Sequence, residues 1–245
     1  MVKQALVVLT MAVVGAGAPP LFAGAQAPAL PTLDQVLDNY VAAVGGRAAL
    51  EKITSLTARG TIEIVGLGLT GTIQLTQKAP DKSMSTVELA GVSQTREGFD
   101  GTVGWEESPQ TGIRTKAGVE LSEARRGAVF PRELKLATIY AKLIVKSREP
   151  VGGRDAILVE AVPAEGVPTR MYFDAESGLL IRQVVTRESP QGPIEVDVTF
   201  SDFRAIDGVK RPFSARQSTA NFVAAIQFTE IKHNVPVDDA VFKKP

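Results

Sequence analysis

The stretch TRMYFDAESGLLIRQVV, residues 169–185, shows the pattern on which the prediction of the fold depends. Its two arms, residues 169–173 and 178–185, alternate apolar and polar side chains, and successive side chains of a strand point to opposite faces. Between the arms lie Asp174, Ser177 and Gly178. These are turn residues, because short polar side chains bond back to the local backbone and glycine reaches positive φ without strain. The stretch therefore predicts a β-hairpin with one apolar face.

The same pattern recurs along most of the chain. Ile62 and Ile64 alternate with polar residues before the turn at Gly66, and Ile73 and Leu75 do so after it, which is typical of a one-sided hairpin. Further strands are predicted at residues 82–89, 93–99, 102–107, 144–150, 156–162, 194–206, 209–219 and 221–233. The sequence thus predicts a mainly β fold of the α+β class, with about ten antiparallel strands in one domain.

Helical patterns occur in two places. Near the N-terminus, Thr32 is a candidate N-cap for a helix over residues 33–44, whose apolar residues recur every three or four positions, and a short helix is expected over residues 47–53. In the middle of the chain, Pro131 suits the first position of an amphipathic helix that contains Leu134, Ile139 and Tyr140. All other segments have the period of strands.

The N-terminal residues resemble a secretory signal. Lys3, an apolar run over residues 5–14 and small residues before Gln26 predict a signal over residues 1–25, a linker over 26–31 and one domain over 32–245. The run is short for a membrane span, so we expect none in the mature chain; an uncleaved N-terminal anchor is the alternative. A bacterial lipoprotein is acylated on a cysteine, and the sequence has none, so we expect a soluble, unlipidated exported protein.

Composition argues against two classes of function. The chain has 27 basic and 27 acidic residues, so no net charge attracts it to nucleic acid. His233 is the only histidine, and we find no phosphate-binding loop, metal-ligand spacing or nucleophile elbow. We expect no enzyme activity, no cofactor and no metal. His233 is interpreted as a hydrogen-bonded strand end; an esterase or peptidase role would need a serine or carboxylate beside it.

The predicted helices are too small to cover the predicted sheet. A 12-residue helix is about 18 Å long, whereas ten strands spaced about 4.8 Å apart span about 50 Å when flat. Such a sheet must curl around its helices into an incomplete barrel. Its apolar inner face then either packs solid or encloses a cavity of the kind that holds hydrophobic ligands. Both outcomes are open at this point.

Three turns lie beside aromatic residues. They are Asp100-Gly101 followed by Trp105, the hairpin that joins Tyr172-Phe173-Asp174 to Gly178-Leu179, and Phe200-Ser201-Asp202-Phe203 followed by Asp207-Gly208. In these motifs the chain resembles the LolA/LolB superfamily of periplasmic outer-membrane lipoprotein-sorting carriers. The resemblance covers nearly all of the mature chain. It implies an open antiparallel β half-barrel whose concave face is apolar and covered by helices, and a role in holding acyl chains in the periplasm.

One departure from the family pattern concerns its lid. The resemblance implies an arginine directly before a proline, which helps to hold the helical lid shut, and this chain has Lys78-Ala79-Pro80 there. Lysine lacks the planar fork of arginine, so the lid mechanism of the family is not carried over. The same fold also occurs in RseB-like sensors of lipids or misrouted lipoproteins.

From these observations we predict a periplasmic carrier that binds the acyl chains of a lipid or lipoprotein, with envelope membrane proteins as further partners. The alternative is a non-catalytic envelope interaction or sensing module with a packed core. The predicted lining residues are the apolar residues of the one-sided strands: Ile62, Ile64, Ile73, Leu75, Trp105, Met171, Phe173, Leu179, Ile181, Val196, Val198, Phe200 and Phe228. Leu134, Ile139 and Tyr140 are the predicted lid residues.

Overall fold

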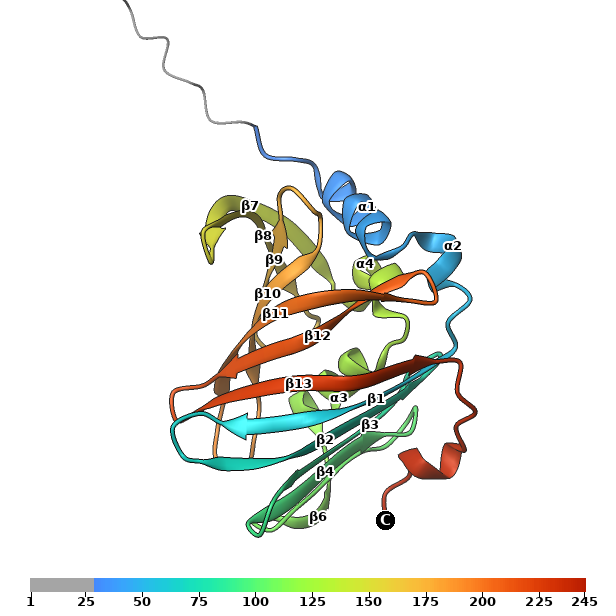
Figure 1. Ribbon diagram of the computed structural model, residues 1–245, viewed down its shortest axis with the longest axis vertical. Helices are drawn as coiled ribbons and strands as arrows, with labels where there is room; N and C mark the ends of the chain where they lie inside the picture. Colours follow the sequence, from blue (N-terminus) through green and yellow to red (C-terminus); the bar gives the residue numbers. More distant parts are fainter. Residues whose placement is uncertain (1–28) are drawn as a thin grey trace, which may run out of the picture.

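A single curled antiparallel sheet forms most of the molecule (Figure 1). The computed structural model describes residues 29–245, so the predicted signal and the start of the predicted linker lie outside the described residues. The first strands are β1 Ser55–Ile64, β2 Leu69–Lys78, β3 Lys82–Leu89, β4 Ser93–Phe99, β5 Gly104–Ser108 and β6 Gly112–Thr115. The others are β7 Lys142–Val151, β8 Arg154–Val162, β9 Thr169–Asp174, β10 Leu180–Arg187, β11 Ile194–Ile206, β12 Val209–Ser218 and β13 Val223–His233.

Two meanders make up the sheet, and one long-range pair joins them. The strand order is β6-β5-β4-β3-β2-β1-β13-β12-β11-β10-β9-β8-β7, so every neighbour is consecutive in sequence except β1 and β13. The hairpin expected at residues 169–185 is confirmed, with Met171 opposite Gln183. The sheet has 13 strands, more than the ten or so predicted. The strand that the sequence analysis missed is β6, which is only four residues long.

The N-terminal helices form as predicted. Helix α1, Leu33–Val44, begins at Thr32, whose side chain accepts from the backbone N–H of Gln35 while the Gln35 side chain accepts from the Thr32 backbone. Helix α2 covers Arg47–Leu50, shorter than expected. No helix within residues 29–245 is long and apolar enough to cross a bilayer.

The prediction for the middle helix is wrong in its placement. The connection between β6 and β7 consists of α3, Gly118–Ala128, a 3-10 turn η1, Arg132–Leu134, and α4, Leu136–Ile139. The longest of these helices therefore ends before Pro131 rather than beginning there. A proline disfavours helical geometry in the residue before it, so the chain bends at this point and restarts in short turns.

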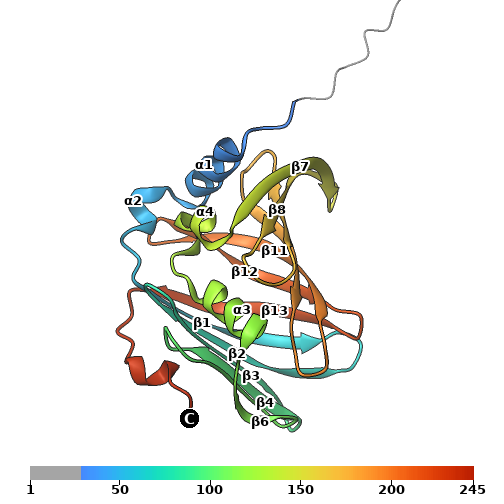
Figure 2. The ribbon, with the colours of Figure 1, turned by 180° about the vertical axis from the view of Figure 1, so that it is seen from behind.

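The register assigns one face of the sheet unambiguously. Paired residues form a row across it from β2 to β7: Leu69, Ile64, Ala224, Gln217, Val198, Gln183, Met171, Val159 and Val145. Residues paired in register share a face, so this row marks one side of the whole sheet. We call it the concave face, because α3 and α4 lie inside the curve of the sheet on this side (Figure 2).

The curl brings distant strands together. Helix α3 packs against β5. A Cβ atom at Gly104 would lie only 3.2 Å from the Leu121 side chain of this helix. From the same helix, Glu123 accepts a hydrogen bond of 3.2 Å from the backbone N–H of Glu188, just beyond β10. Strands β5 and β10 are far apart in the strand order. Helix α3 therefore bridges the two sides of the half-barrel.

Candidate functional site

Most predicted lining residues lie on the concave face. The register places Ile62, Ile64, Ile73, Leu75, Met171, Phe173, Val196, Val198, Phe200 and Phe228 there. Leu179 and Ile181 flank the irregular start of β10 and are buried in a hydrophobic cluster with Val184 and Phe213. The predicted alternation thus identifies the face correctly, and burial then divides it into parts with different properties.

The prediction that Trp105 lines the concave face is wrong. Trp105 pairs with Gly98, whereas Phe99 and Gly104 pair on the α3 side, so Trp105 points away from the concave face. Its indole Nε1 donates a hydrogen bond of 2.7 Å to the carbonyl oxygen of Phe242 in the C-terminal turn. A Cβ at Gly98 would lie 2.6 Å from the indole ring, so the glycine makes room for it. Trp105 is therefore the core of the opposite face.

The part of the concave face on β8 and β9 is covered by helices. Met171, Phe173, Ile157, Val159 and Ala161 form a buried cluster with Val36 of α1 and with Leu136 and Tyr140 of the mid-chain connection. The Phe173 ring meets the Tyr40 ring edge-on, with centroids 5.2 Å apart. We call this cluster the covered part. Of the predicted lid residues, Tyr140 and Ile139 pack here, and Leu134 packs against the neighbouring cluster.

A buried ion pair ties the mid-chain connection to the sheet. The Arg211 guanidinium on β12 contacts the Glu133 carboxylate in η1, and their side chains are only 10% and 9% exposed. Arg211 Nε also donates to His233 Nε2 at 3.3 Å. Burial, together with the positive charge of Arg211, lowers the pKa of His233, which favours the neutral ring. Asp207 lies on the other side of the ring, with its Oδ2 3.4 Å from His233 Nδ1, so His233 lies between an arginine and a carboxylate at the end of β13.

Lys78 precedes Ala79, the position at which the resemblance implies an arginine, and it contacts the C-terminal segment. Lys78 Nζ donates to the carbonyl oxygen of Val237 and to the Asp239 carboxylate, each at 2.8 Å. Both partners belong to the C-terminal segment rather than to the mid-chain connection. That connection is held by a backbone hydrogen bond of 2.9 Å from the Phe130 N–H to the Pro80 carbonyl and by the ion pair of Arg211, which no local sequence motif marks.

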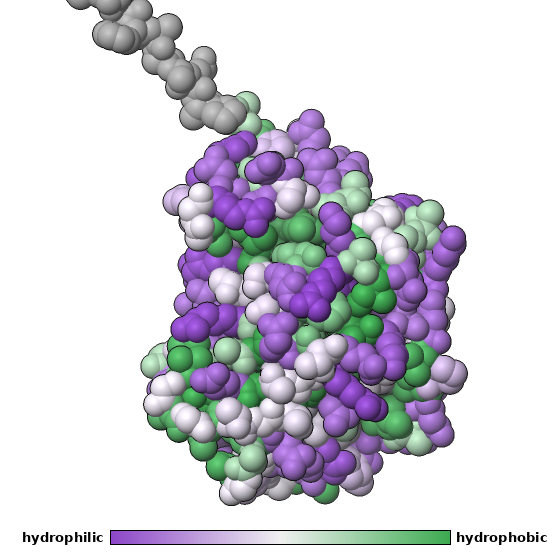
Figure 3. Space-filling model, viewed as in Figure 1, coloured by the Kyte–Doolittle hydropathy of each residue, from purple (hydrophilic) through white to green (hydrophobic). Residues whose placement is uncertain are grey.

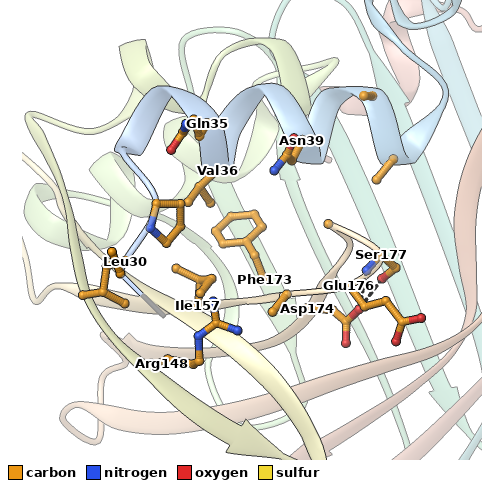
Figure 4. A pocket seen from close by; sticks show the side chains of 16 residues that line it. Leu30, Gln35, Val36, Asn39, Arg148, Ile157, Phe173, Asp174, Glu176 and Ser177 are labelled. Carbon is orange, nitrogen blue, oxygen red and sulfur yellow. Dashed lines mark hydrogen bonds between the residues drawn. The ribbon is translucent and has the colours of Figure 1, made fainter. Parts of the chain in front are cut away.

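A pocket of about 640 Å³ opens at the edge of the covered part (Figure 4). Val36, Ile157 and Phe173 point into it from α1, β8 and β9, and the turn of residues 174–178 forms its rim. At Gly178 a Cβ would lie 2.9 Å from the carbonyl oxygen of Asn39, and φ is +74°, so the glycine permits this close approach of α1 to the turn. The volume is within the usual range of ligand sites.

The charged side chains Asp174 and Arg148 at this pocket both have ion-pair partners. Asp174 accepts from the backbone N–H and hydroxyl of Ser177 and pairs with Arg154 at 2.8 Å. Burial alone would raise the pKa of Asp174, but these partners outweigh it and lower the pKa. Arg148 pairs loosely with Asp155 at 3.4 Å, and its buried Nε has no hydrogen-bond partner. The pocket thus has an apolar floor and one incompletely bonded arginine.

Of the predicted lining residues, only Phe173 borders this pocket. Residues 174–178 form the predicted turn and residues 33–44 the predicted helix. No local pattern indicates that the helix lies over the turn, because residues 39 and 178 are far apart in the chain.

One further stretch of the concave face, apart from the residues packed under α1 and α2, has only strand residues in its hydrophobic cluster. Ile62, Ile64, Ala215, Ala224 and Ile226 are buried there, and each belongs to a strand. The apolar side chains packed around them are only partly buried: Leu69, Ile73, Val87, Leu89, Val198, Phe200 and Phe228. The curvature of the sheet brings the central side chains into contact with one another. A single layer of sheet cannot cover the outer apolar side chains in the same way. We call these residues the open part.

Charged residues border the open part beside α3. Lys116 Nζ donates to Glu97 on β4 at 2.7 Å, and Arg114 bridges Glu106 and Glu120 at 2.7 Å. Burial alone would raise the pKa of Glu97, but Lys116 and Arg187 outweigh it and lower the pKa to about 2. The Glu97 side chain is 41% exposed although protein surrounds it, so its carboxylate faces solvent inside the curve of the sheet. The described residues include no group of His, Cys, Asp and Glu side chains arranged to hold a metal ion.

The sequence matches no protein-family model and no curated protein. Solved structures do match. A LolA superfamily protein from Nitrosomonas europaea aligns with a TM-score of 0.58 and 13% identity, over 88% of this chain and 99% of that chain. A DUF1329 family protein from Desulfovibrio piger aligns with a TM-score of 0.56 and 15% identity, over 86% and 97%.

A third solved structure points to the same fold. A putative outer membrane lipoprotein-sorting protein domain from Vibrio parahaemolyticus aligns with a TM-score of 0.55 and 10% identity, over 80% of this chain and 92% of that chain. At such identities the likeness concerns the fold alone. The resemblance drawn from the sequence motifs is therefore confirmed at the level of structure: this chain has the fold of the LolA superfamily.

Proposed function

We propose that this protein is a periplasmic, non-catalytic binding protein that holds the acyl chains of a lipid or lipoprotein against the open part of its concave face. One observation carries the proposal: the open part is an apolar cluster built only from strand residues, and its outer members remain partly exposed. The LolA-like fold is consistent with this role. Outer-membrane lipoprotein sorting is the finer form of the same proposal.

The physical basis is the free energy of covering apolar surface. Fully burying a side chain such as Leu or Phe contributes about 1.5 to 3 kcal/mol, and the outer residues of the open part have already lost part of that exposure. An acyl chain can lie along these side chains without any polar contact. Release then needs only an apolar acceptor, so transfer by mass action requires no covalent step.

The covered part supports a second candidate. Met171, Phe173 and Val159 are almost fully buried under α1 and α4, as in an ordinary packed core. If the open part also closes in solution, the protein is an envelope interaction or sensing module with no bound lipid. The two candidates differ in whether the concave face accepts a guest molecule.

The test is native mass spectrometry of the purified protein together with lipid extraction and titration with an apolar naphthylamine probe. We expect co-purifying lipid or saturable probe binding. The double variant Ile73→Thr/Val198→Thr keeps β-branched shapes on the open part and adds hydroxyl groups, so probe binding should weaken by roughly tenfold. Val241→Thr changes an exposed residue away from this face and should bind like the wild type. If no lipid co-purifies and the probe does not bind, the carrier proposal is wrong.

A further inference from the structure

We propose that one end of the half-barrel docks on a lipid bilayer through apolar side chains at the tips of its hairpins. The large exposed hydrophobic residues are not scattered. Except for Leu30 and Val241, they lie in or beside the turns β1–β2, β3–β4, β5–β6, β8–β9, β10–β11 and β12–β13. We call them the apolar rim: Val65, Leu67, Val92, Ile113, Val167, Ile194 and Phe222.

Antiparallel topology places all of these turns at one end of the sheet. Because each strand reverses the direction of the one before it, alternate hairpin turns share an end, and the β1–β13 pair aligns the two meanders. The backbone N–H of Val65 donates to the Val223 carbonyl at 2.8 Å, and that of Ala90 donates to the Thr70 carbonyl at 3.0 Å. Neighbouring turns are therefore in contact, and Figures 1 and 2 show this end pointing away from α1 and α2.

The exposed fractions of the rim residues range from 38% for Ile194 to 66% for Leu67. Leu67 is 66% exposed and Val92 is 58% exposed, whereas an ordinary core side chain of this sheet, such as Ile64, is 8% exposed. In Figure 3, separate hydrophobic patches lie among polar residues over the ends of β1, β2, β12 and β13 at the lower left. Each turn contributes one or two such side chains, so the apolar surface is distributed around the rim.

The charge of these turns identifies a bilayer as the partner. Within residues 65–68, 90–92, 109–111, 163–168, 188–193 and 219–222, only Glu165 and Glu188 are charged. Glu165 accepts a hydrogen bond of 2.6 Å from Ser122 of α3. The turns at the other end differ: Asp81, Asp100, Glu176 and Asp207 give them negative charge, and they carry no exposed large hydrophobic residue. An end with apolar tips and almost no charge fits the membrane interface.

The rim also adjoins the open part. Leu69 follows the β1–β2 turn directly, and Leu89 precedes the β3–β4 turn, and both belong to the partly buried set of the open part. A docked rim would place bilayer lipid next to these side chains. That connection rests on the proposed function, whereas docking itself does not.

The test is flotation of the purified protein, residues 29–245, with phosphatidylcholine vesicles and, separately, with vesicles that contain phosphatidylserine. We expect comparable binding to both and little release by salt, because the contact is apolar and the rim has almost no charge. The variant Leu67→Gln/Phe222→Gln changes two exposed rim residues and should reduce vesicle binding at least tenfold, since each inserted side chain accounts for roughly a tenfold change in partitioning.

Leu30→Gln/Val241→Gln is the matched control, because it changes exposed apolar residues outside the rim and should float like the wild type. The docking proposal is overturned if the wild type does not float, if it binds only anionic vesicles and leaves them in salt, or if the rim variant floats normally. Self-association that the rim variant abolishes, without vesicle binding, would assign the rim to a second copy and overturn it too. The rim variant should retain naphthylamine binding, so failure of docking and failure of lipid holding are distinguishable.

Discussion

The covered part and the open part share one face of one sheet but differ in what lies above them. Over β8 and β9, Phe173 and Met171 are almost fully buried by α1 and the mid-chain connection. Over the β1, β2 and β11 region, Ile73 and Phe200 belong to a hydrophobic cluster made of strand residues and stay partly exposed. The same alternating pattern therefore yields a packed core where helices supply apolar side chains to the cluster, and a partly buried apolar surface where only strands do.

The largest expected change in stability comes from truncating one phenylalanine in each part, which tests this difference directly. Phe173→Ala should lower the free energy of unfolding by about 3 to 5 kcal/mol, because it leaves a cavity under α1. Phe200→Ala should cost about half as much, because its ring is already partly in contact with water. Urea unfolding of both variants measures the two losses, and equal losses would contradict the division of the face.

Variants of Arg211 and Glu133 test whether their ion pair holds the mid-chain connection over the covered part. Arg211→Met leaves the Glu133 carboxylate buried without its partner, so we expect a loss of about 3 kcal/mol in stability and faster hydrogen exchange in α4. Adding Glu133→Gln should restore much of this loss, since the orphaned charge is then removed. If the double variant is no more stable than Arg211→Met, the ion pair does not hold the connection in place.

Trp105→Phe tests whether a change on the face opposite the open part alters stability without altering probe binding. It removes the hydrogen bond from Nε1 to the Phe242 carbonyl, so we expect a loss of about 1 kcal/mol in stability. Naphthylamine binding should be unchanged, because Trp105 lies on the face opposite the open part. A clear loss of probe binding in a stably folded Trp105→Phe protein would contradict this placement.

The smallest expected effect concerns the charged border of the open part. The pKa of Glu97 is lowered from 4.5 to about 2, so its pairing with Lys116 stabilises the fold above pH 4.5 and is lost as the pH falls toward 2. Partial exposure screens the pair, so the contribution should be below about 1 kcal/mol. Glu97→Gln should flatten the acid limb of a stability-against-pH curve, and an unchanged limb would contradict the pairing.

Local patterns were sufficient to predict individual elements. The hairpin of residues 169–185, the helix capped at Thr32 and the one-sided strands all follow from the spacing of apolar residues and from turn chemistry. The side of Trp105 was not predictable in this way. Its face depends on the register of β5 against β4, and the residue that covers it, Phe242, is more than a hundred positions away.

Most strands, and the alternation of side chains along each of them, follow from the amino-acid sequence, because they depend on contacts between near neighbours in the chain; the short strand β6 and the side of Trp105 do not. The position of α1, the contact of Arg211 with Glu133 and the part of the concave face that stays open depend instead on contacts between distant segments. These features arise from closure of β1 on β13 and from the path of the mid-chain connection. Such long-range contacts depend on the shape of the assembled sheet, and no local period encodes that shape.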